Sequence, residues 1–151
     1  MIHEPVPGEP GWHTWATPLT TGFNSVVLGD LRVRTEGERS VRLRMHPGSH
    51  HSNLGGALHG GVAMALIDVS LFAAPSILID KRLVGGVTVD LSCQFIGSGS
   101  LTDPADAVTE VLRETGRLVF QRGLLMQGEH LVASYTGTIR KPSLPQSGQT
   151  R

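Results

Sequence analysis

The chain has 151 residues, which suits one domain with a hydrophobic core of its own. Its 13 Lys and Arg residues balance its 13 Asp and Glu residues, so no overall field attracts nucleic acid or an anionic membrane. A single cysteine excludes an intrachain disulfide framework, and the lack of a charged leader followed by a long apolar run predicts a cytoplasmic protein.

The first part of the chain predicts an arm followed by two strands. Residues 1–22 contain four prolines and two tryptophans with little periodicity, so we expect an irregular N-terminal arm. The folded domain is expected to begin at residue 23, with a short helical turn over residues 23–28. Strands are then expected at residues 31–34 and 40–45, joined by a turn around residues 36–38.

A histidine-rich loop follows over residues 46–53. It contains His46, His50 and His51, and His59 comes shortly afterwards. These imidazoles would suffice for a metal ion, yet they have neither regular ligand spacing nor a nearby Cys or Asp pattern. We therefore predict no metal site and interpret the loop histidines as solvated.

The central helix is the strongest feature of the sequence. Between residues 60 and 79 the side chains are apolar on nearly every side, which predicts a helix buried in the core. The helix is expected to begin near Gly60 and run to about Ala73. Pro75 should then kink or end it, with at most one further turn to residue 79, because proline lacks the backbone N–H.

Asp68 is the only charged residue of this helix. Burying an ionised carboxylate without partners is costly, so it is either a hydrogen-bonded structural group or a functional one. The glycines before the helix favour function, because they let a ligand approach the free N–H groups of the first turn. Such a helix terminus can hold a developing oxyanion.

The longest strand is expected at residues 87–95. Strict alternation would direct the apolar side chains toward the helix and the polar ones toward water, a ligand or another subunit. The apolar set is Val87, Val89, Leu91, Cys93 and Phe95, and the polar set is Thr88, Asp90, Ser92 and Gln94. Cys93 lies in the apolar set, so we interpret it as a small buried hydrophobe rather than a nucleophile.

Three more strands are expected at residues 105–113, 117–126 and 130–140, with turns short enough for antiparallel hairpins. Two strands, one long helix and four antiparallel strands indicate an α+β domain whose sheet wraps the helix. Residues 142–151 have too little apolar content to fold, so we expect a flexible C-terminal tail.

Taken together, the pattern Asn53-x5-His59-Gly60-Gly61-x6-Asp68 and the segment 86–90 resemble the hotdog-fold acyl-CoA thioesterases of the phenylacetate-pathway type. The resemblance covers about residues 23–141. It implies a hotdog fold and hydrolysis of an acyl-CoA thioester, with coenzyme A as part of the substrate and no separate cofactor.

The resemblance also implies roles for individual residues. The Gly60 N–H and the Asn53 side chain would polarise the thioester carbonyl, and Asp68 would activate water or attack directly. His59 would shape the site, and Thr88 would orient the water or the carboxylate. Contacts to the substrate and its coenzyme A moiety are expected from a further set of residues: Gly61, Asp90, Phe95, Gly97, Ser98, Arg113, Gly116 and Arg117.

Gly60 and Asp68 cannot serve one carbonyl from the same chain, because eight helical positions separate them by about 12 Å along the axis. Two antiparallel helices across a twofold axis would bring the first turn of one close to Asp68 of the other. As in the hotdog thioesterases, we therefore expect a homodimer with shared sites, or a homotetramer built from such dimers.

Two other functions compete with this interpretation. A non-catalytic hotdog module could bind acyl-CoA as a sensor or regulator, and a hotdog hydratase or dehydratase is a weaker third possibility. The joint presence of Asn53, Asp68 and Thr88 favours catalysis. Serine-hydrolase chemistry is not expected, because the chain has no Gly-x-Ser-x-Gly nucleophile elbow.

Overall fold

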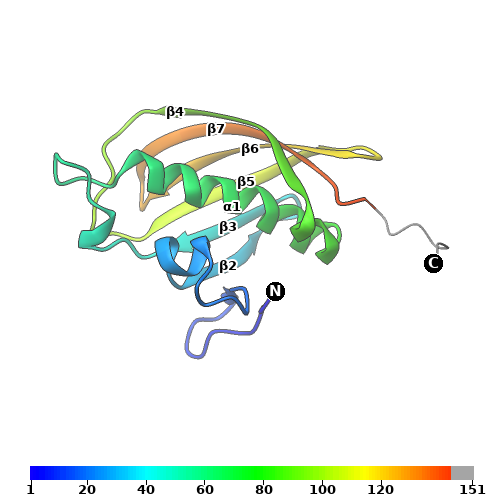
Figure 1. The fold of residues 1–151 in the computed structure, drawn as a ribbon, viewed down its shortest axis with the longest axis horizontal. Helices are drawn as coiled ribbons and strands as arrows, with labels where there is room; N and C mark the ends of the chain where they lie inside the picture. Colours follow the sequence, from blue (N-terminus) through cyan, green and yellow to red (C-terminus); the bar gives the residue numbers. More distant parts are fainter. Residues whose placement is uncertain (144–151) are drawn as a thin grey trace.

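A computed structural model describes residues 1–143 as a curved antiparallel sheet wrapped around one long helix (Figure 1). Short helical segments cover Asn24–Leu28, Ser49–His51 and Lys81–Gly85. The main elements are β1 (His13–Trp15), β2 (Leu31–Glu36), β3 (Ser40–Met45), α1 (Gly60–Leu78), β4 (Val87–Phe95), β5 (Ala105–Glu114), β6 (Leu118–Gln127) and β7 (His130–Arg140).

The strands form one sheet in the order β1-β2-β3-β5-β6-β7-β4, with every neighbouring pair antiparallel. The chain leaves β3, forms α1, and then crosses to the far edge as β4 before returning to β5. The predicted α+β hotdog fold is therefore confirmed. Of the predicted tail, residues 144–151 lie outside the part of the chain that the structure describes.

The hydrophobic core lies between α1 and the concave face of the sheet. Leu66, Ile67 and Leu71 of the helix are fully buried against strand residues such as Leu43 and Ile139. Each such side chain contributes about 1.5–3 kcal/mol of burial free energy. By length and composition α1 could cross a membrane, but here it is the core helix of a wrapped sheet.

One stripe of α1 is less covered than the sequence predicted. Gly61 is exposed, and Ala65, Asp68 and Phe72 are only partly buried. Their spacing of four, three and four residues places them on one side of the helix. The expectation of a helix buried on every side is therefore wrong along this stripe, and Asp68 lies on it.

Pro75 neither ends nor interrupts α1, which continues to Leu78. Proline has no N–H to donate to the carbonyl of residue 71, four positions earlier. The Gln121 side chain on β6 supplies the missing donor, because its Nε2 donates to the Leu71 carbonyl at 2.9 Å. The predicted end near residue 73 is therefore wrong, because a neighbouring strand supplies the donor that Pro75 lacks, whereas the further turn expected toward residue 79 is present.

A β-bulge in β4 changes which side chains face the helix. Thr88 pairs with Ile139 and Asp90 pairs with Thr138, so three residues on β4 match two on β7. Val89 is 53% exposed, whereas Thr88 reaches α1. The expected strict alternation is wrong at this point, and the bulge is what brings Thr88 to the helix side of the strand.

The N-terminal arm packs on the body and is less irregular than expected. Its strand β1 pairs with β2 at the sheet edge. Trp12 is buried, with the guanidinium carbons of Arg34 and Arg44 at 4.7 and 4.4 Å from its ring centre. These cation–π contacts fix the arm against β2 and β3.

Candidate active site

The carboxylate predicted to be catalytic has one hydrogen-bonded oxygen and one free oxygen. Thr88 Oγ1 donates to Asp68 Oδ1 at 2.6 Å. Within residues 1–143, Asp68 Oδ2 has no hydrogen-bond partner. The two residues therefore form the pair that the sequence predicted, with the second carboxylate oxygen available to a ligand or to water.

The first turn of α1 leaves one particular amide available. His59 is the N-cap residue, and its Nδ1 accepts a hydrogen bond from the Gly61 N–H at 2.9 Å. The His59 carbonyl accepts from Val62 and Ala63. The Gly60 N–H has no acceptor in the described part of the chain. It is thus a free donor at the positive end of a helix dipole.

His51 holds the residue that caps this helix terminus. Its Nδ1 accepts from the Gly48 N–H at 2.9 Å and its Nε2 faces the Val27 carbonyl at 2.6 Å, which together require the neutral ring protonated on Nε2. Its carbonyl accepts from the His59 N–H at 2.8 Å. The expected solvation of all three loop histidines is wrong for His51, which is buried, while His46 and His50 are exposed.

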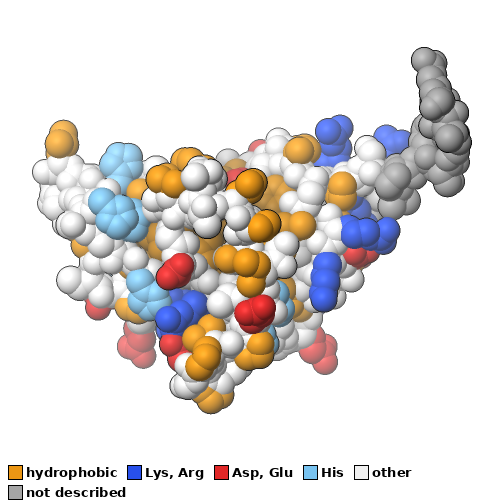
Figure 2. Space-filling view, turned by 60° about the horizontal axis from the view of Figure 1, so that its bottom comes forward, with side chains coloured by type: hydrophobic (Ala, Val, Ile, Leu, Met, Phe, Trp, Pro, Cys, Tyr) orange, Lys and Arg blue, Asp and Glu red, His pale blue; other side chains and the backbone are white. Residues whose placement is uncertain are grey.

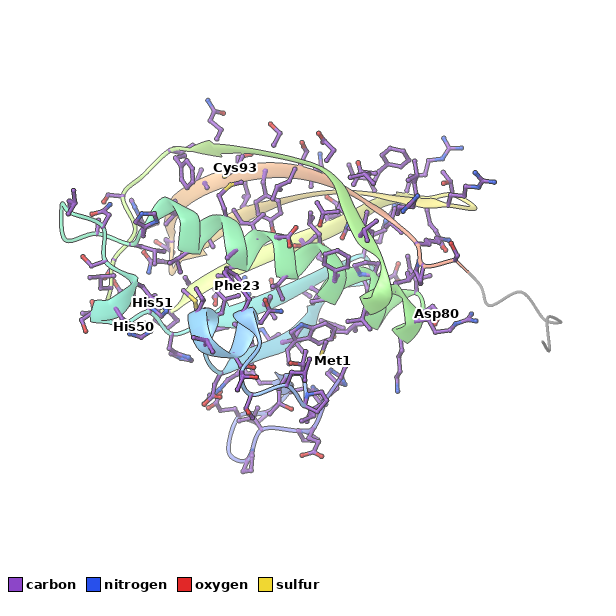
Figure 3. All side chains as sticks on the ribbon, in the orientation of Figure 1. Met1, Phe23, His50, His51, Asp80 and Cys93 are labelled. Carbon is purple, nitrogen blue, oxygen red and sulfur yellow. The ribbon has the colours of Figure 1, made fainter. Side chains whose placement is uncertain are left out.

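Figure 3 labels His50 and His51 side by side at the helix-start end of the molecule. Their ring centres are 3.8 Å apart. Within residues 1–143, no three His, Cys, Asp or Glu side chains are grouped so that they could hold a metal ion. The supporting role of His51 was missed from the sequence, because its spacing does not distinguish it from His50.

Asn53 is held by its own loop so that its amide nitrogen stays available. Its Oδ1 accepts from the N–H groups of Gly55 and Ala57 at 2.8 and 3.1 Å. The Nδ2 group has no acceptor within residues 1–143. Asn53 and His59 both line a cavity of about 530 Å³ beside the start of α1. Asn53 Nδ2 and the Gly60 N–H are therefore two unused donors near one helix terminus.

Phe95, Gly97 and Ser98 lie at this same end. A Cβ on Gly60 would meet the Phe95 ring at 3.3 Å, so the ring packs over that glycine. A Cβ on Gly97 would come within 2.6 Å of the Leu131 carbonyl, so this close approach requires glycine. The Ser98 carbonyl accepts from His130 Nε2 at 2.9 Å.

The other predicted substrate contacts are elsewhere in the protomer. Arg113, Gly116 and Arg117 belong to the β5–β6 hairpin, which lies at the opposite end of the molecule (Figure 1). Asp90 pairs with Thr138 beyond the bulge, two residues after Thr88. One chain therefore does not bring the predicted coenzyme A contacts together.

Cys93 is a poor nucleophile in this setting. It is partly buried against the core, and desolvation raises the pKa of its thiol. A higher pKa lowers the fraction of thiolate, which is the reactive form. This agrees with the prediction that Cys93 is a packing residue.

Comparison with known proteins defines the family. Residues 55–134 match the Thioesterase superfamily. PA0474 of Pseudomonas aeruginosa, a protein named for an inferred esterase activity, is 31% identical over 116 residues, which are 77% of this chain and 86% of that protein. The chain belongs to the thioesterase superfamily, and it is a thioester hydrolase.

Solved structures show the same fold. Zebrafish thioesterase superfamily member 2 has a TM-score of 0.70 and 24% identity, covering 81% of this chain and 88% of that chain. The PaaI protein from the phenylacetic acid degradation operon of Escherichia coli has a TM-score of 0.69 and 18% identity, covering 82% and 86%. The predicted resemblance to the phenylacetate-pathway type is confirmed at the level of fold.

Proposed function

We propose that the protein is an acyl-CoA thioesterase of the cytoplasm, with Asp68 as its catalytic carboxylate. The observation that carries the proposal is the pair formed by Thr88 of β4 and Asp68, which lies on the partly uncovered stripe of α1. One carboxylate oxygen is held at 2.6 Å by the Thr88 hydroxyl, and the other faces no partner within residues 1–143. That arrangement fixes the group and leaves one oxygen free to react.

In the proposed reaction, the free oxygen of Asp68 either takes a proton from the attacking water or attacks the thioester carbonyl itself. Carbonyl addition places negative charge on the thioester oxygen, and collapse of this intermediate breaks the C–S bond and releases coenzyme A as its thiolate, which takes up a proton. After direct attack, water then hydrolyses the acyl anhydride on Asp68 and regenerates the carboxylate. The Gly60 N–H and Asn53 Nδ2 are suited to stabilise that charge, because both are donors without an internal acceptor. A general base contributes about 10²–10⁴ in rate, and an oxyanion donor contributes a comparable factor.

The proposed site is shared between two chains. Gly60 and Asp68 are about 12 Å apart along the helix axis, too far to meet at one carbonyl. The partly exposed stripe of α1 lies beside β4, an edge strand on which Val87 and Val89 are about half exposed. A second copy packed antiparallel against this surface would cover the apolar side chains and place its Gly60 toward Asp68.

An antiparallel dimer would also explain where the predicted coenzyme A contacts lie. The group around Phe95 is at the helix-start end of a protomer, and the hairpin that carries Arg113 and Arg117 is at the other end. A twofold axis across the helix brings unlike ends of the two protomers together. The arginines would then supply charge for the nucleotide phosphates.

The first test is Asp68→Asn, which keeps the size of the side chain but removes its charge. We expect turnover of a good acyl-CoA substrate to fall by roughly 10²-fold or more, with acyl-CoA affinity largely retained. Asp30→Asn is the matched control, because Asp30 is exposed and its side chain makes no hydrogen bond in the described structure. Wild-type turnover in folded Asp68→Asn would refute the catalytic role. A wild type that binds acyl-CoA but hydrolyses no thioester would favour the sensor alternative.

The shared site has a separate test. Gly60→Pro removes the free N–H at a position where proline suits a helix, and Asp68→Ala removes the carboxylate. Each variant alone should be inactive. In a mixed dimer one site carries both changes and the other carries neither, so activity should partly return. Verified subunit exchange without any recovery would refute sharing while leaving the role of Asp68 intact.

A further inference from the structure

A second cavity lies at the far end of α1, where the N-terminal arm meets the last helical turn and the segment after it. Its volume is about 570 Å³, which falls within the range of about 300–1,000 Å³ that is usual for small-molecule sites. Figure 3 labels Met1 and Asp80, two of its lining residues, on the arm and just after α1. The cavity is thus built from parts of the chain that are distant in sequence.

Much of the lining is apolar. Trp15 of β1 forms one wall, Ile77 comes from the end of α1, and Val84 comes from the following helical segment. Val84 is 37% exposed, while Trp15 is only 6% exposed and belongs to the core. Figure 2 turns this side of the molecule forward and shows apolar side chains among acidic and basic ones. The lining suits an apolar ligand body.

Besides the acidic Asp80, three polar side chains interrupt this lining. Ser76 is 5% exposed, and its Oγ has no hydrogen-bond partner within residues 1–143. Buried hydroxyls usually have such a partner. Lys81 and His3 also line the cavity, and Lys81 forms no ion pair in the described part of the chain. The polar groups of the lining therefore include unused donors.

The one acidic group of the lining is already neutralised. Arg82 donates to both carboxylate oxygens of Asp80 through its backbone N–H, Nε and Nη2, at 2.6 to 3.1 Å. These hydrogen bonds lower the pKa of Asp80 to about 2, so it stays ionised and paired. Lys81 is left as an unbalanced side-chain charge at the cavity.

His3 is also held where an anion would stabilise its charged form. Its ring stacks on His13 with centres 4.5 Å apart. Burial first, and then the charges of His13 and Lys81, lower the pKa of His3. An anionic ligand would oppose the last two effects, because a nearby opposite charge favours the protonated imidazole.

We propose that this cavity binds an apolar monocarboxylate, with Lys81 and His3 receiving the carboxylate while the walls around Trp15 enclose the apolar chain. Ser76 supplies a further hydroxyl to the same site. The cavity starts about two helical turns after Asp68, and its lining residues do not include Asp68 or Thr88. It is a second site, and its existence does not depend on thioester hydrolysis.

The probe for this site is sodium octanoate, followed through Trp15 fluorescence in a Trp12→Phe background and by calorimetry on the whole protein. We expect saturable binding of octanoate. 1-Octanol, which has the chain without the charge, and acetate, which has the charge without the chain, should each bind at least about tenfold more weakly. Equal binding of octanol and octanoate would overturn the role given to the carboxylate.

The location of the bound carboxylate needs a matched pair of variants. Lys81→Met should weaken octanoate binding about tenfold, the loss expected for one charge-assisted hydrogen bond. Lys141→Met makes the same charge change outside the cavity and should leave the affinity within about twofold. Equal losses in both variants would refute a specific contact with Lys81.

A second readout separates this cavity from any octanoate bound at the active site. The His3 imidazole, titrated by NMR, should show a higher pKa when octanoate is bound, and Ser76→Ala should weaken binding without unfolding the protein. No change at His3 on saturation would place the ligand elsewhere and overturn the proposal. Neither measurement needs turnover, so the outcome is independent of the thioesterase test.

Discussion

The pairing of Pro75 with Gln121 gives a quantitative test of how α1 is stabilised. The helix passes through a proline, and the carbonyl of Leu71 takes its hydrogen bond from Gln121 Nε2 at 2.9 Å instead of from the residue 75 backbone. Gln121 is 2% exposed, so water cannot easily replace it. Gln121→Met removes the donor while keeping a side chain of similar length.

The expected cost follows from leaving a buried carbonyl without a partner, which is about 1–3 kcal/mol. Gln121 Oε1 itself has no hydrogen-bond partner within residues 1–143, so its removal recovers part of that cost. We therefore expect Gln121→Met to lower the unfolding free energy by about 1–2 kcal/mol. Pro75→Ala should restore a backbone N–H four residues after Leu71.

The double-mutant cycle isolates this interaction. In the Pro75→Ala background the Leu71 carbonyl already has a backbone partner, so Gln121→Met should be nearly neutral or stabilising. The coupling energy should therefore be about 1–2 kcal/mol. Urea unfolding of all four proteins at one protein concentration measures it, because a dimer makes stability concentration-dependent. Additive effects would show that Gln121 does not compensate for the proline.

Two further predictions concern the packing between α1 and the sheet. Tyr135 is the only tyrosine, and burial raises its pKa from 10.0 to about 12. Its contribution to the unfolding free energy should therefore be complete below pH 10 and be lost as the pH rises toward 12. Tyrosinate absorbance and unfolding curves measured over this pH range test the prediction, with Tyr135→Phe as the control. Ionisation of Tyr135 near pH 10 in the folded protein would contradict it. Gly137→Ala would place a Cβ 2.3 Å from Leu71 Cδ1 and should cost about 1–3 kcal/mol, whereas Gly116→Ala has no atom within 4 Å and should cost little.

The sequence predicted the positions of Asp68, Thr88 and Gly60 relative to one element better than it predicted the contacts that support the start of α1. The Asp68–Thr88 pair and the free amide of Gly60 correspond to a spaced pattern whose residue types have recognisable chemistry. By contrast, His51 is buried through bonds to Gly48 and to the Val27 carbonyl. Those partners are backbone atoms, which carry no residue-specific signal, so no pattern could have distinguished His51 from its exposed neighbour.

Two of the errors in the predicted elements, at Pro75 and at Val89, involve a contact with another element. Strict alternation in β4 gave no sign of the bulge at Val89, because apolar and polar residue types alternate through that position without a break. Pro75 carries a strong local signal to stop a helix, and the group that overrides it is on β6. Local propensity predicts a helix or strand well, except where a hydrogen bond from another element changes the free energy of forming it.

Three unused polar groups connect the fold to the proposed dimer. Asp68 Oδ2, the Gly60 N–H and Asn53 Nδ2 all lack partners within residues 1–143, although the same segments satisfy Asp68 Oδ1, the Gly61 N–H and Asn53 Oδ1 internally. In the side chains of Asp68 and Asn53 one atom is held internally and the other is left available, and in the first turn of α1 the Gly61 N–H is held while the neighbouring Gly60 N–H is free. Because the carboxylate is about two helical turns from the Gly60 N–H in one chain, a common ligand would require the partner's helix. Each protomer thus carries donors at the start of α1 and a separate carboxylate at Asp68, which supports a site formed by the donors of one protomer and the carboxylate of the other.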